Sequence, residues 1–362
     1  MEYLKLEDCC EILDSKRIPV TANKRRNGKY PYYGANGLQD YVDDYIFDDE
    51  LVLLAEDGGN FNSKDKPIAY RVSGKCWVNN HAHVLKPKQG ISVDYLCYAL
   101  MYYDVSGLVN GATRQKLTQA TMRKMKIPIL SEIDQLRIVE IMNSIQELKN
   151  DYRSILHKLD VLIKARFIEM FGDLKSNEKD WDLKTFEEMS VLITDGEHST
   201  PKRTKEGIYL LSARNVLNHS LQLEDVDYIN RDEYLRIAKR VVPKKGDILI
   251  SCSGTIGRCC SIPDSLQLQM VRSVALIRFK EVINPIFAEY MITSDYLQEQ
   301  INSSKTMSSQ ANLFQGKIRK LKGFLPPTEL QQQFADFVQQ VDKSRFDIKK
   351  SITELEREVV YD

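Results

Sequence analysis

Few side chains of this 362-residue chain stand at spacings that suit chemistry of their own. His81 and His83 are separated by one residue, but no cysteine, aspartate or third histidine follows at the spacing of a zinc site. Glu197 and His198 are adjacent and lack a helical partner. Because the five histidines are scattered, we predict that the chain binds no metal.

The sequence also lacks the motifs of two enzyme classes. An amino-methyltransferase needs Asn or Asp, then Pro-Pro, then Tyr or Phe, together with a glycine-rich cofactor loop. The nearest strings, Lys29-Tyr-Pro-Tyr-Tyr33 and Phe324-Leu-Pro-Pro-Thr328, do not combine the polar first residue with the aromatic last one. Gly28-Lys29 is followed by Tyr30, so a Walker-type phosphate loop is absent as well. We expect the chain to be non-catalytic and to hold no cofactor.

The seven cysteines indicate a reducing compartment. Cys9–Cys10 and Cys259–Cys260 are adjacent pairs, which cannot easily form a relaxed disulfide or a spaced metal site. Cys76, Cys97 and Cys252 are isolated in apolar or strand-like surroundings. The sequence has no apolar run near the roughly 18 residues that span a bilayer, and its start does not resemble a signal peptide. We therefore expect reduced, core-packed thiols and a cytoplasmic protein.

Length and charge narrow the class of protein. A chain of 362 residues exceeds what one hydrophobic core usually organises, so at least two domains are expected. The 51 basic and 51 acidic residues cancel over the whole chain, but they are unevenly distributed. Basic residues outnumber acidic ones by 18 to 16 in residues 1–130 and by 22 to 20 in residues 173–327. Acidic residues outnumber basic ones by 7 to 6 in residues 131–172 and by 8 to 5 in residues 328–362. The mildly basic segments are compatible with DNA binding through local patches, without establishing it.

The sequence contains an internal duplication at an offset of 196 residues. Segments 113–126 and 309–322 share a leucine, a glutamine, an Arg-Lys pair and a final lysine at matching positions. Farther along, Gln135 falls on Gln331. Matches at one shared offset predict a repeated unit, in which a domain of short strands and helices is followed by a long helix.

Both long helices carry heptad patterns of apolar residues. In the first, from Ser131 to Phe171, steps of three and four connect Ile138, Ile141, Ile145, Leu148, Tyr152, Ile155, Leu159 and Leu162. In the second, one heptad position holds Phe334, Val341, Ile348 and Leu355, and the other holds Val338, Ile352 and Val359, with Arg345 interrupting. Each helix could pack on its own domain, but the similar lengths of the two strict heptad patterns favour packing of the helices on each other, as an antiparallel pair.

The predicted fold class is therefore α+β, with two globular α/β domains in pseudo-twofold repeat, separated by two long helices packed as an antiparallel coiled coil. The expected boundaries are a first domain at 1–130, a central helix at 131–172, a second domain at 173–327 and a C-terminal helix at 328–362.

This layout resembles the specificity subunits of type I restriction–modification systems over the whole length of the chain. Phe167-Ile-Glu-Met-Phe-Gly-Asp173 resembles the end of the family's central helix. Asp195–Pro201 and Gly246–Gly257 resemble segments of its recognition domains, and Tyr30–Gly37 with Asp40–Asp43 is similar to another recurrent type. The order and spacing of these segments make the resemblance specific.

The resemblance implies a non-catalytic subunit of a complex that methylates adenine in DNA as part of host defence. Each target-recognition domain would read one half of a split, asymmetric target in double-stranded DNA, and the helices would set the gap. Two methyltransferase subunits would dock largely on the helices, and translocase–nuclease subunits would join through them. S-adenosylmethionine and ATP are then expected only in the partner subunits. A coiled-coil interaction scaffold without sequence-specific DNA binding is the alternative.

In a DNA-reading subunit, lysine and arginine in loops bind phosphates, while Arg, Asn and Gln can also contact base edges. The candidates in the first domain are Lys24, Arg25, Arg26, Tyr32, Tyr33, Asn79, Asn80, His81, Arg114, Gln115 and Lys116. Those in the second are His198, Lys202, Arg203, Arg214, Asn215, Ser253, Thr255, Arg272, Ser273, Gln310 and Asn312, with Arg272–Ser273 near the position of Asn80–His81. Lys24, Lys116, Lys202, Arg203 and Lys205 are the expected phosphate contacts.

The repeated Arg-Lys-x-Lys of residues 123–126 and 319–322 has two interpretations. It could grip phosphates, or it could be the polar face of a short helix beside the long one, which we favour.

Overall fold

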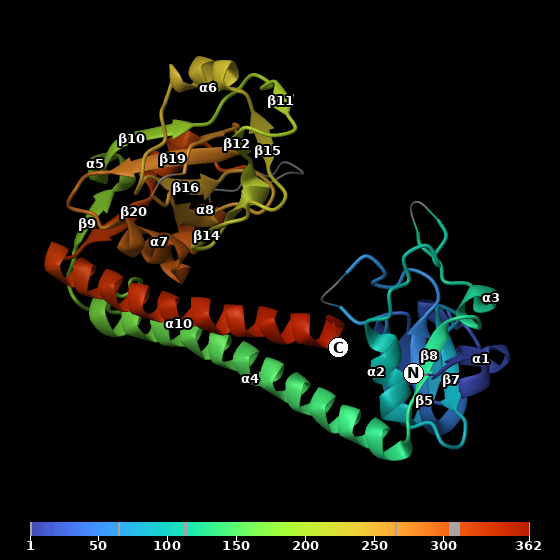
Figure 1. Cartoon of the computed structure of the whole chain (residues 1–362). Helices are drawn as coiled ribbons and strands as arrows, with labels where there is room; N and C mark the ends of the chain where they lie inside the picture. Colours follow the sequence, from blue (N-terminus) through green and yellow to red (C-terminus); the bar gives the residue numbers. More distant parts are fainter. Residues whose placement is uncertain (1, 64–65, 112–113, 265, 304–311, 362) are drawn as a thin grey trace. The chain divides into compact units, whose positions relative to one another are not determined.

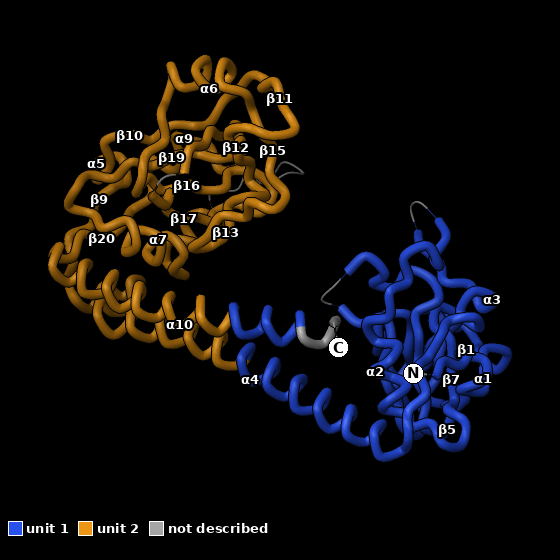
Figure 2. The backbone as a smooth tube through the Cα atoms, in the orientation of Figure 1, with its two compact units in different colours: residues 1–153, 350–362 blue, residues 154–349 orange. Residues whose placement is uncertain are grey.

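The computed structural model describes residues 2–63, 66–111, 114–264, 266–303 and 312–361, with side chains up to residue 357. Two compact units are formed by residues 1–153 with 350–362, and by residues 154–349 (Figure 2). Among the described residues, no helix combines the length and apolar character needed to cross a membrane. All seven cysteines are buried and unpaired, which confirms the expected core-packed thiols.

A six-stranded sheet forms the centre of unit 1 (Figure 1). Its strands lie in the order β2 (Cys10–Ile12), β7 (Ala82–Pro87), β5 (Phe47–Ala55), β6 (Ala69–Val78), β3 (Asn27–Gly34) and β4 (Gly37–Val42). Side chains alternate between the two faces of β5. Val52 and Leu54 pack in one apolar cluster with Leu96 of helix α2 (Val93–Met101), and Leu51 and Leu53 belong to a second cluster. With both faces covered, the end of β5 is fully buried.

The remaining elements of unit 1 connect the sheet to the first long helix. Strand β1 (Glu2–Lys5) pairs with β8 (Lys126–Ile129), and short helices α1 (Leu6–Cys9) and α3 (Gln119–Met122) flank this pair in the sequence. Two 3-10 turns, Asp14–Lys16 and Ala22–Lys24, follow β2.

Unit 2 has two four-stranded sheets. One has the order β10 (Ser190–Asp195), β19 (Val274–Phe279), β16 (Ile248–Ser251) and β17 (Cys259–Ser261). The other has the order β11 (Arg203–Thr204), β15 (Asp227–Ile229), β12 (Ile208–Leu211) and β18 (Leu268–Met270). The accompanying elements are the pairs β9 (Asp182–Thr185) with β20 (Lys322–Leu325) and β13 (Val216–Leu217) with β14 (Ser220–Leu221), and the helices α5 (Phe186–Met189), α6 (Arg231–Ala238), α7 (Pro285–Thr293), α8 (Asp295–Ser303) and α9 (Gln315–Lys320).

Corresponding backbone hydrogen bonds in the two units confirm the predicted duplication. Leu117 N donates to Glu56 O at 2.8 Å, and Leu313 N donates to Cys252 O at 2.9 Å. The same correspondence relates Leu6 N–Met125 O to Phe186 N–Leu321 O, both 2.8 Å, and Lys88 N–Cys9 O to Lys280 N–Met189 O, both 2.9 Å. The repeat therefore extends to the beginning of each half, where sequence similarity is weak.

The long helices α4 (Glu132–Phe171) and α10 (Thr328–Tyr361) pack on each other in antiparallel order. Phe167 and Phe334 meet with ring centroids 5.3 Å apart, Asp160 binds Arg345, and Lys149 Nζ lies 3.0 Å from the Glu356 carboxylate. Residue numbers thus fall along α4 as they rise along α10. This confirms mutual packing, and the Arg345 that interrupts the second heptad pattern forms an ion pair between the helices.

The burial of the helix residues corrects the expected seam of α4. The heptad position of Ile138, Ile145, Tyr152 and Leu159 is partly buried, as expected. The second predicted position is solvent-exposed, since Ile141, Leu148, Ile155 and Leu162 are 59, 45, 39 and 47% exposed. The seam instead uses the position of Met142, Lys149, Leu156 and Ile163. In α10, Phe334, Val338 and Val341 are buried and Ile348, Ile352 and Leu355 are partly buried, whereas the side chain of Val359 lies outside the described part of the chain.

Candidate nucleic-acid interface

Three loops of unit 1 come together just beyond strand β5. Asp57 and Lys116 form a backbone bridge, and Gly58 N donates to Gln115 O at 3.1 Å. Glu56 N donates to His81 O at 2.9 Å. The predicted contacts at residues 80–81 and 114–116, far apart in the sequence, therefore share one surface.

Asp57 organises the charges on this surface. Its carboxylate accepts from Arg114 Nε at 2.5 Å and lies 3.5 Å from Nδ1 of His81. The Arg114 side chain is 59% exposed, and its Nη2 lies 3.4 Å from His81 Nδ1. We did not predict Asp57 because an acid does not bind phosphate, but its place after a buried strand was a usable signal.

The basic loop of residues 24–29 begins in the second 3-10 turn, before strand β3. Lys24 and Arg26 are exposed. The Arg25 guanidinium lies 4.2 Å from the centroid of the Tyr32 ring and 3.3 Å from the Asp40 carboxylate, so it is largely engaged within the unit. Tyr33 is half-buried, and burial raises the pKa of its hydroxyl.

Three of the predicted DNA-binding residues are buried, which corrects their assignment. Tyr32, Asn79 and Asn215 are 1, 3 and 0% exposed. The Tyr32 hydroxyl bonds to the backbone of Val20, and Asn79 Nδ2 donates to Gln39 Oε1 at 3.1 Å. Asn215 donates to two carbonyl oxygens, at 2.8 and 3.0 Å. Their polar groups support loops rather than contact DNA, and the sequence pattern did not distinguish these two roles.

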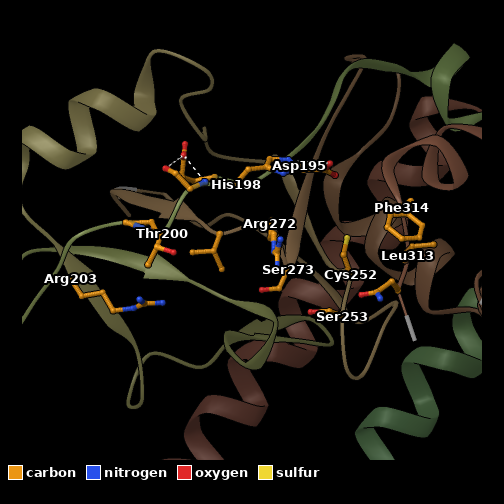
Figure 3. A pocket seen from close by; sticks show the side chains of 15 residues that line it. Asp195, His198, Thr200, Arg203, Cys252, Ser253, Arg272, Ser273, Leu313 and Phe314 are labelled. Carbon is orange, nitrogen blue, oxygen red and sulfur yellow. Dashed lines mark hydrogen bonds and ion pairs between the residues drawn. The ribbon is translucent and has the colours of Figure 1, made fainter. Parts of the chain in front are cut away.

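In unit 2 the corresponding region is hollowed into a cavity of about 740 Å³. Figure 3 shows Thr200 and Arg203 on one side of it, Ser253, Leu313 and Phe314 on the other, and Arg272 between them. Of the predicted residues, the cavity brings together His198, Arg203, Ser253, Arg272, Ser273 and Asn312. It also includes residues that we did not predict, namely Asp195, Glu197, Ser199, Thr200, Pro201, Cys252, Val271, Leu313 and Phe314.

The cavity has charges of both signs. His198 Nε2 lies 3.7 Å from the Asp195 carboxylate, and Glu197 accepts hydrogen bonds from Ser199 and Arg236. These hydrogen bonds lower the pKa of Glu197, and the bond from the Ser199 hydroxyl has the largest effect. Within the part of the chain that the structure describes, the exposed Arg272 guanidinium has no hydrogen-bond or ion-pair partner. Arg272 is therefore the donor of this cavity that is most available to a ligand.

The other predicted residues of unit 2 lie around this cavity or in separate turns. Lys202 and Lys205 are exposed. Arg203 and Arg214 both pair with Asp227, at 2.9 and 3.4 Å. Thr255 is exposed in the turn after β16, and Gln310 lies outside the described residues.

Equivalent hydrogen bonds place the surface of unit 1 and the cavity of unit 2 at the same point of the repeat. Cys252 N donates to Ser273 O at 2.8 Å, as Glu56 N does to His81 O. Ser253 and Asn312 form the bridge that Asp57 and Lys116 form in unit 1. The predicted correspondence of Asn80–His81 with Arg272–Ser273 is thus confirmed, and the side chains at the equivalent positions differ.

The repeated Arg-Lys-x-Lys also has a structural contact in each unit. Arg123 lies 3.5 Å from the Glu7 carboxylate, and Arg319 lies 3.3 Å from that of Glu187. Because both arginines hold the short helix at the beginning of their own unit, the polar-face interpretation is favoured over phosphate binding.

Comparison with known proteins agrees with this duplicated architecture. The family model for the type I restriction modification DNA specificity domain matches residues 1–158 and again 178–357. A putative type I restriction enzyme specificity subunit of Haemophilus influenzae is 29% identical over 270 residues, which are 71% of this chain and 67% of that protein. The EcoprrI specificity subunit of Escherichia coli is 21% identical over 136 residues, 38% of this chain and 33% of the relative.

Solved structures share the fold. The S subunit of a type I restriction-modification system from M. genitalium aligns with a TM-score of 0.55 and 12% identity, over 99% of this chain and 93% of that one. A chain from a study of the assembly and conformational transition of the type I R-M system aligns with a TM-score of 0.58 and 13% identity, over 99 and 95%. With the family's domain matched once in each half, the chain belongs to the type I restriction–modification specificity subunits.

Proposed function

We propose that this chain is the non-catalytic subunit that gives a type I restriction–modification complex its DNA sequence specificity. Each domain reads one half of a split, asymmetric target, and the helix pair sets the unread gap. The observation that carries the proposal is that one backbone arrangement presents two different sets of polar side chains, at Asp57, His81 and Lys116 and at Ser253, Ser273 and Asn312.

The difference between the two sets supports two different half-sites. Unit 1 offers Asn80, His81, Arg114 and Lys116 on an exposed surface. Unit 2 offers Arg272 beside a cavity with serine and asparagine side chains. Arginine pairs best with guanine and asparagine with adenine, so two such surfaces favour different base sequences.

The exposed face of α4 supports docking of methyltransferase subunits. Ile141, Leu148, Ile155 and Leu162 repeat every seven residues and form an apolar stripe on this one helix, although none of them is buried. Contiguous exposed apolar surface is typical of protein–protein contacts. In this proposal two methyltransferase subunits cover the stripe, translocase–nuclease subunits join the assembly, and S-adenosylmethionine and ATP bind only in these partners.

Methylome sequencing of cells that co-express this chain with its methyltransferase subunits tests the proposal. We expect an asymmetric motif of two short parts separated by a fixed gap, methylated on adenine of both strands. A continuous palindrome would contradict it. Gel shifts over a salt series, with and without the methyltransferase, separate it from an interaction scaffold, which would show no DNA-dependent effect.

A further inference from the structure

A buried network of four ionisable side chains lies beneath the loops of the unit 1 surface. The Asp14 carboxylate accepts from His83 Nδ1 at 2.6 Å, and the Glu56 carboxylate accepts from Arg17 Nη1 at 2.6 Å. Arg17 Nη2 is also 3.5 Å from Asp14. His83 is fully buried, and the other three side chains are 5–12% exposed. No pattern in the sequence indicates this network, because its members come from separate segments.

Both ring nitrogens of His83 are engaged within the network. Nε2 faces the carbonyl oxygen of Leu117 at 2.9 Å, and Nδ1 faces the Asp14 carboxylate at 2.6 Å. The Asp14 carboxylate also accepts from the Val84 amide and from Gln119 Nε2, both at 2.9 Å. The buried polar groups therefore have partners within the unit, as buried ionic side chains require.

The oxygen and nitrogen atoms of Asp14, Glu56 and His83 lie within 4.8 Å of one another, a spacing that can hold a metal ion. Here Arg17 occupies the space between the two carboxylates, and both nitrogens of His83 are engaged. The group is therefore a closed ion network and not a vacant cation site.

The network contacts two of the loops that carry candidate DNA contacts. Toward the loop of residues 114–119, His83 bonds to Leu117 O, Glu56 pairs with Lys116 Nζ at 3.1 Å, and Gln119 Nε2 donates to Asp14 at 2.9 Å. Toward the loop before β7, Arg17 Nη1 donates to Ala82 O at 2.7 Å. Moving any of these groups would move Arg114, Lys116 or His81.

Unit 2 lacks this network at the equivalent positions. His83 pairs with Leu54 in the sheet of unit 1, and Ala275 pairs with Ile250 at the corresponding point of unit 2. Glu56 corresponds to Cys252 through their matching bonds to Leu117 and Leu313. Cys252 lines the cavity. In unit 1, ionisable side chains therefore fill a region that is left open in unit 2.

We propose that the network of Asp14, Arg17, Glu56 and His83 is the positioning group that sets the sequence preference of the first domain. The inference rests on the proposed function of this surface. His83 does not touch DNA; it fixes the backbone of Leu117, and thereby the loop from which Arg114 and Lys116 project.

Discrimination between half-sites tests this proposal with the full chain assembled with its methyltransferase subunits. The measured quantity is the ratio of affinities for the methylome-defined target and for duplexes with one base changed in either half-site. Arg114→Ala and Arg272→Ala identify which half-site belongs to which domain. His83→Gln is the positioning variant, and Gln119→Leu is a milder one that removes a single bond to Asp14. Leu53→Ala, in the core of the same sheet, controls for lost stability.

Partial unfolding of a variant lowers its affinity for every duplex by the same factor. This factor therefore cancels in the ratio of the two affinities. We expect His83→Gln to reduce discrimination at the first half-site at least tenfold, Gln119→Leu to reduce it less, and both to leave the second half-site unchanged. Leu53→Ala should change neither ratio. Unchanged discrimination at the first half-site in both variants would overturn the positioning role. Wild-type complex without preference at either half-site would instead overturn the proposed function, and this inference with it.

Amide hydrogen exchange of the free full chain gives a second measurement that needs no DNA. We expect His83→Gln to accelerate exchange at least tenfold in the segment 114–122, with β5 and β7 unchanged. Equal exchange of that segment in the variant and the wild type would also overturn the positioning role.

Discussion

Gln135 and Gln331 make the same set of hydrogen bonds in the two halves of the molecule. Each is buried near the start of a long helix, and each Oε1 accepts at 2.8 Å from the backbone N–H of the residue that caps a shorter helix, Ser92 or Asn284. Each Nε2 donates to two carbonyl oxygens, those of Gly90 and Leu130 or of Val282 and Pro326. These glutamines therefore fasten the long helix of each half to its own domain.

Replacing either glutamine should destabilise its unit. Gln331→Ala leaves the buried carbonyl group of Pro326 and two part-buried backbone groups, Asn284 N–H and Val282 C=O, without this partner, and a buried group left unpaired costs about 1–3 kcal/mol. We expect the free energy of unfolding in urea to fall by at least that amount. The exposed Gln339→Ala on the same helix is the control and should change it by less than about 0.5 kcal/mol. Equal stabilities of the two variants would contradict the fastening role.

Charges placed in the helix seam should separate the helices. Ile145→Asp with Leu159→Asp introduces two carboxylates at partly buried positions of α4 that face α10. Burial of an unpaired charge costs several kcal/mol, so we expect a loss of helical circular dichroism and of complex assembly. A folded, fully active complex from this double variant would contradict the mutual packing.

The same charges on the exposed stripe should have a different effect. Ile141→Asp with Leu162→Asp alters two solvent-exposed positions of α4, so the melting temperature should stay within a few degrees of the wild type. Association with the methyltransferase should weaken at least tenfold, measured by analytical ultracentrifugation. Undiminished association would show that the partner docks elsewhere.

Arg272 and Lys202 should affect DNA binding in different ways. We expect Arg272→Ala to lose about 1–3 kcal/mol of discrimination at one base pair of the second half-site. Lys202→Ala should weaken binding to all duplexes alike and reduce the slope of log K against log salt by about 1. Fluorescence anisotropy over a salt series measures both. If Arg272→Ala weakens every duplex equally, Arg272 contacts phosphate.

Acid should destabilise the ion network of unit 1. Burial by itself raises the pKa of Asp14. The interaction with His83 and the hydrogen bond from the Val84 amide outweigh burial and lower this pKa below its usual 3.8. For Glu56, burial likewise raises the pKa, and Arg17, His83 and Lys116 lower it below 4.5. Because both folded-state pKa values are depressed, the stabilisation is present above about pH 4.5 and is lost as pH falls through the folded-state values.

Comparison with Asp14→Asn isolates this contribution. At pH 7 the variant should be less stable by about 3–5 kcal/mol, the typical cost of breaking a buried ion pair. The urea midpoints of the variant and the wild type should converge toward pH 3. A constant difference across this range would show that Asp14 stabilises unit 1 by other means.

Sequence patterns predicted the elements that repeat or run long, because a period or an offset is visible without any knowledge of contacts. The duplication, both long helices and their antiparallel packing are of this kind. The prediction of the packing face of α4 was half wrong, because one position of the seam is occupied by Lys149 and not by an apolar residue. Lys149 forms an ion pair there with Glu356. Composition indicates an exposed lysine there, and only the partner helix shows otherwise.

The candidate site was predictable only as a set of loops. Polarity identifies Asn79 and Asn80 equally, yet Asn79 is buried against Gln39 and Asn80 is exposed. Which of two neighbouring amides faces solvent depends on the strand that lies beside it. The network of Asp14, Arg17, Glu56 and His83 was invisible for the same reason, because its members come from three separate segments.

The backbone bonds at Glu56 and Cys252 have an evolutionary consequence. These bonds involve only N–H and C=O groups, so they persist whatever side chains occupy the positions around them. Mutation can therefore replace the side chains of the proposed DNA surfaces while the scaffold keeps its geometry. Under the proposed function, a lineage can then acquire a new recognition sequence through few substitutions, and each half can diversify independently of the other.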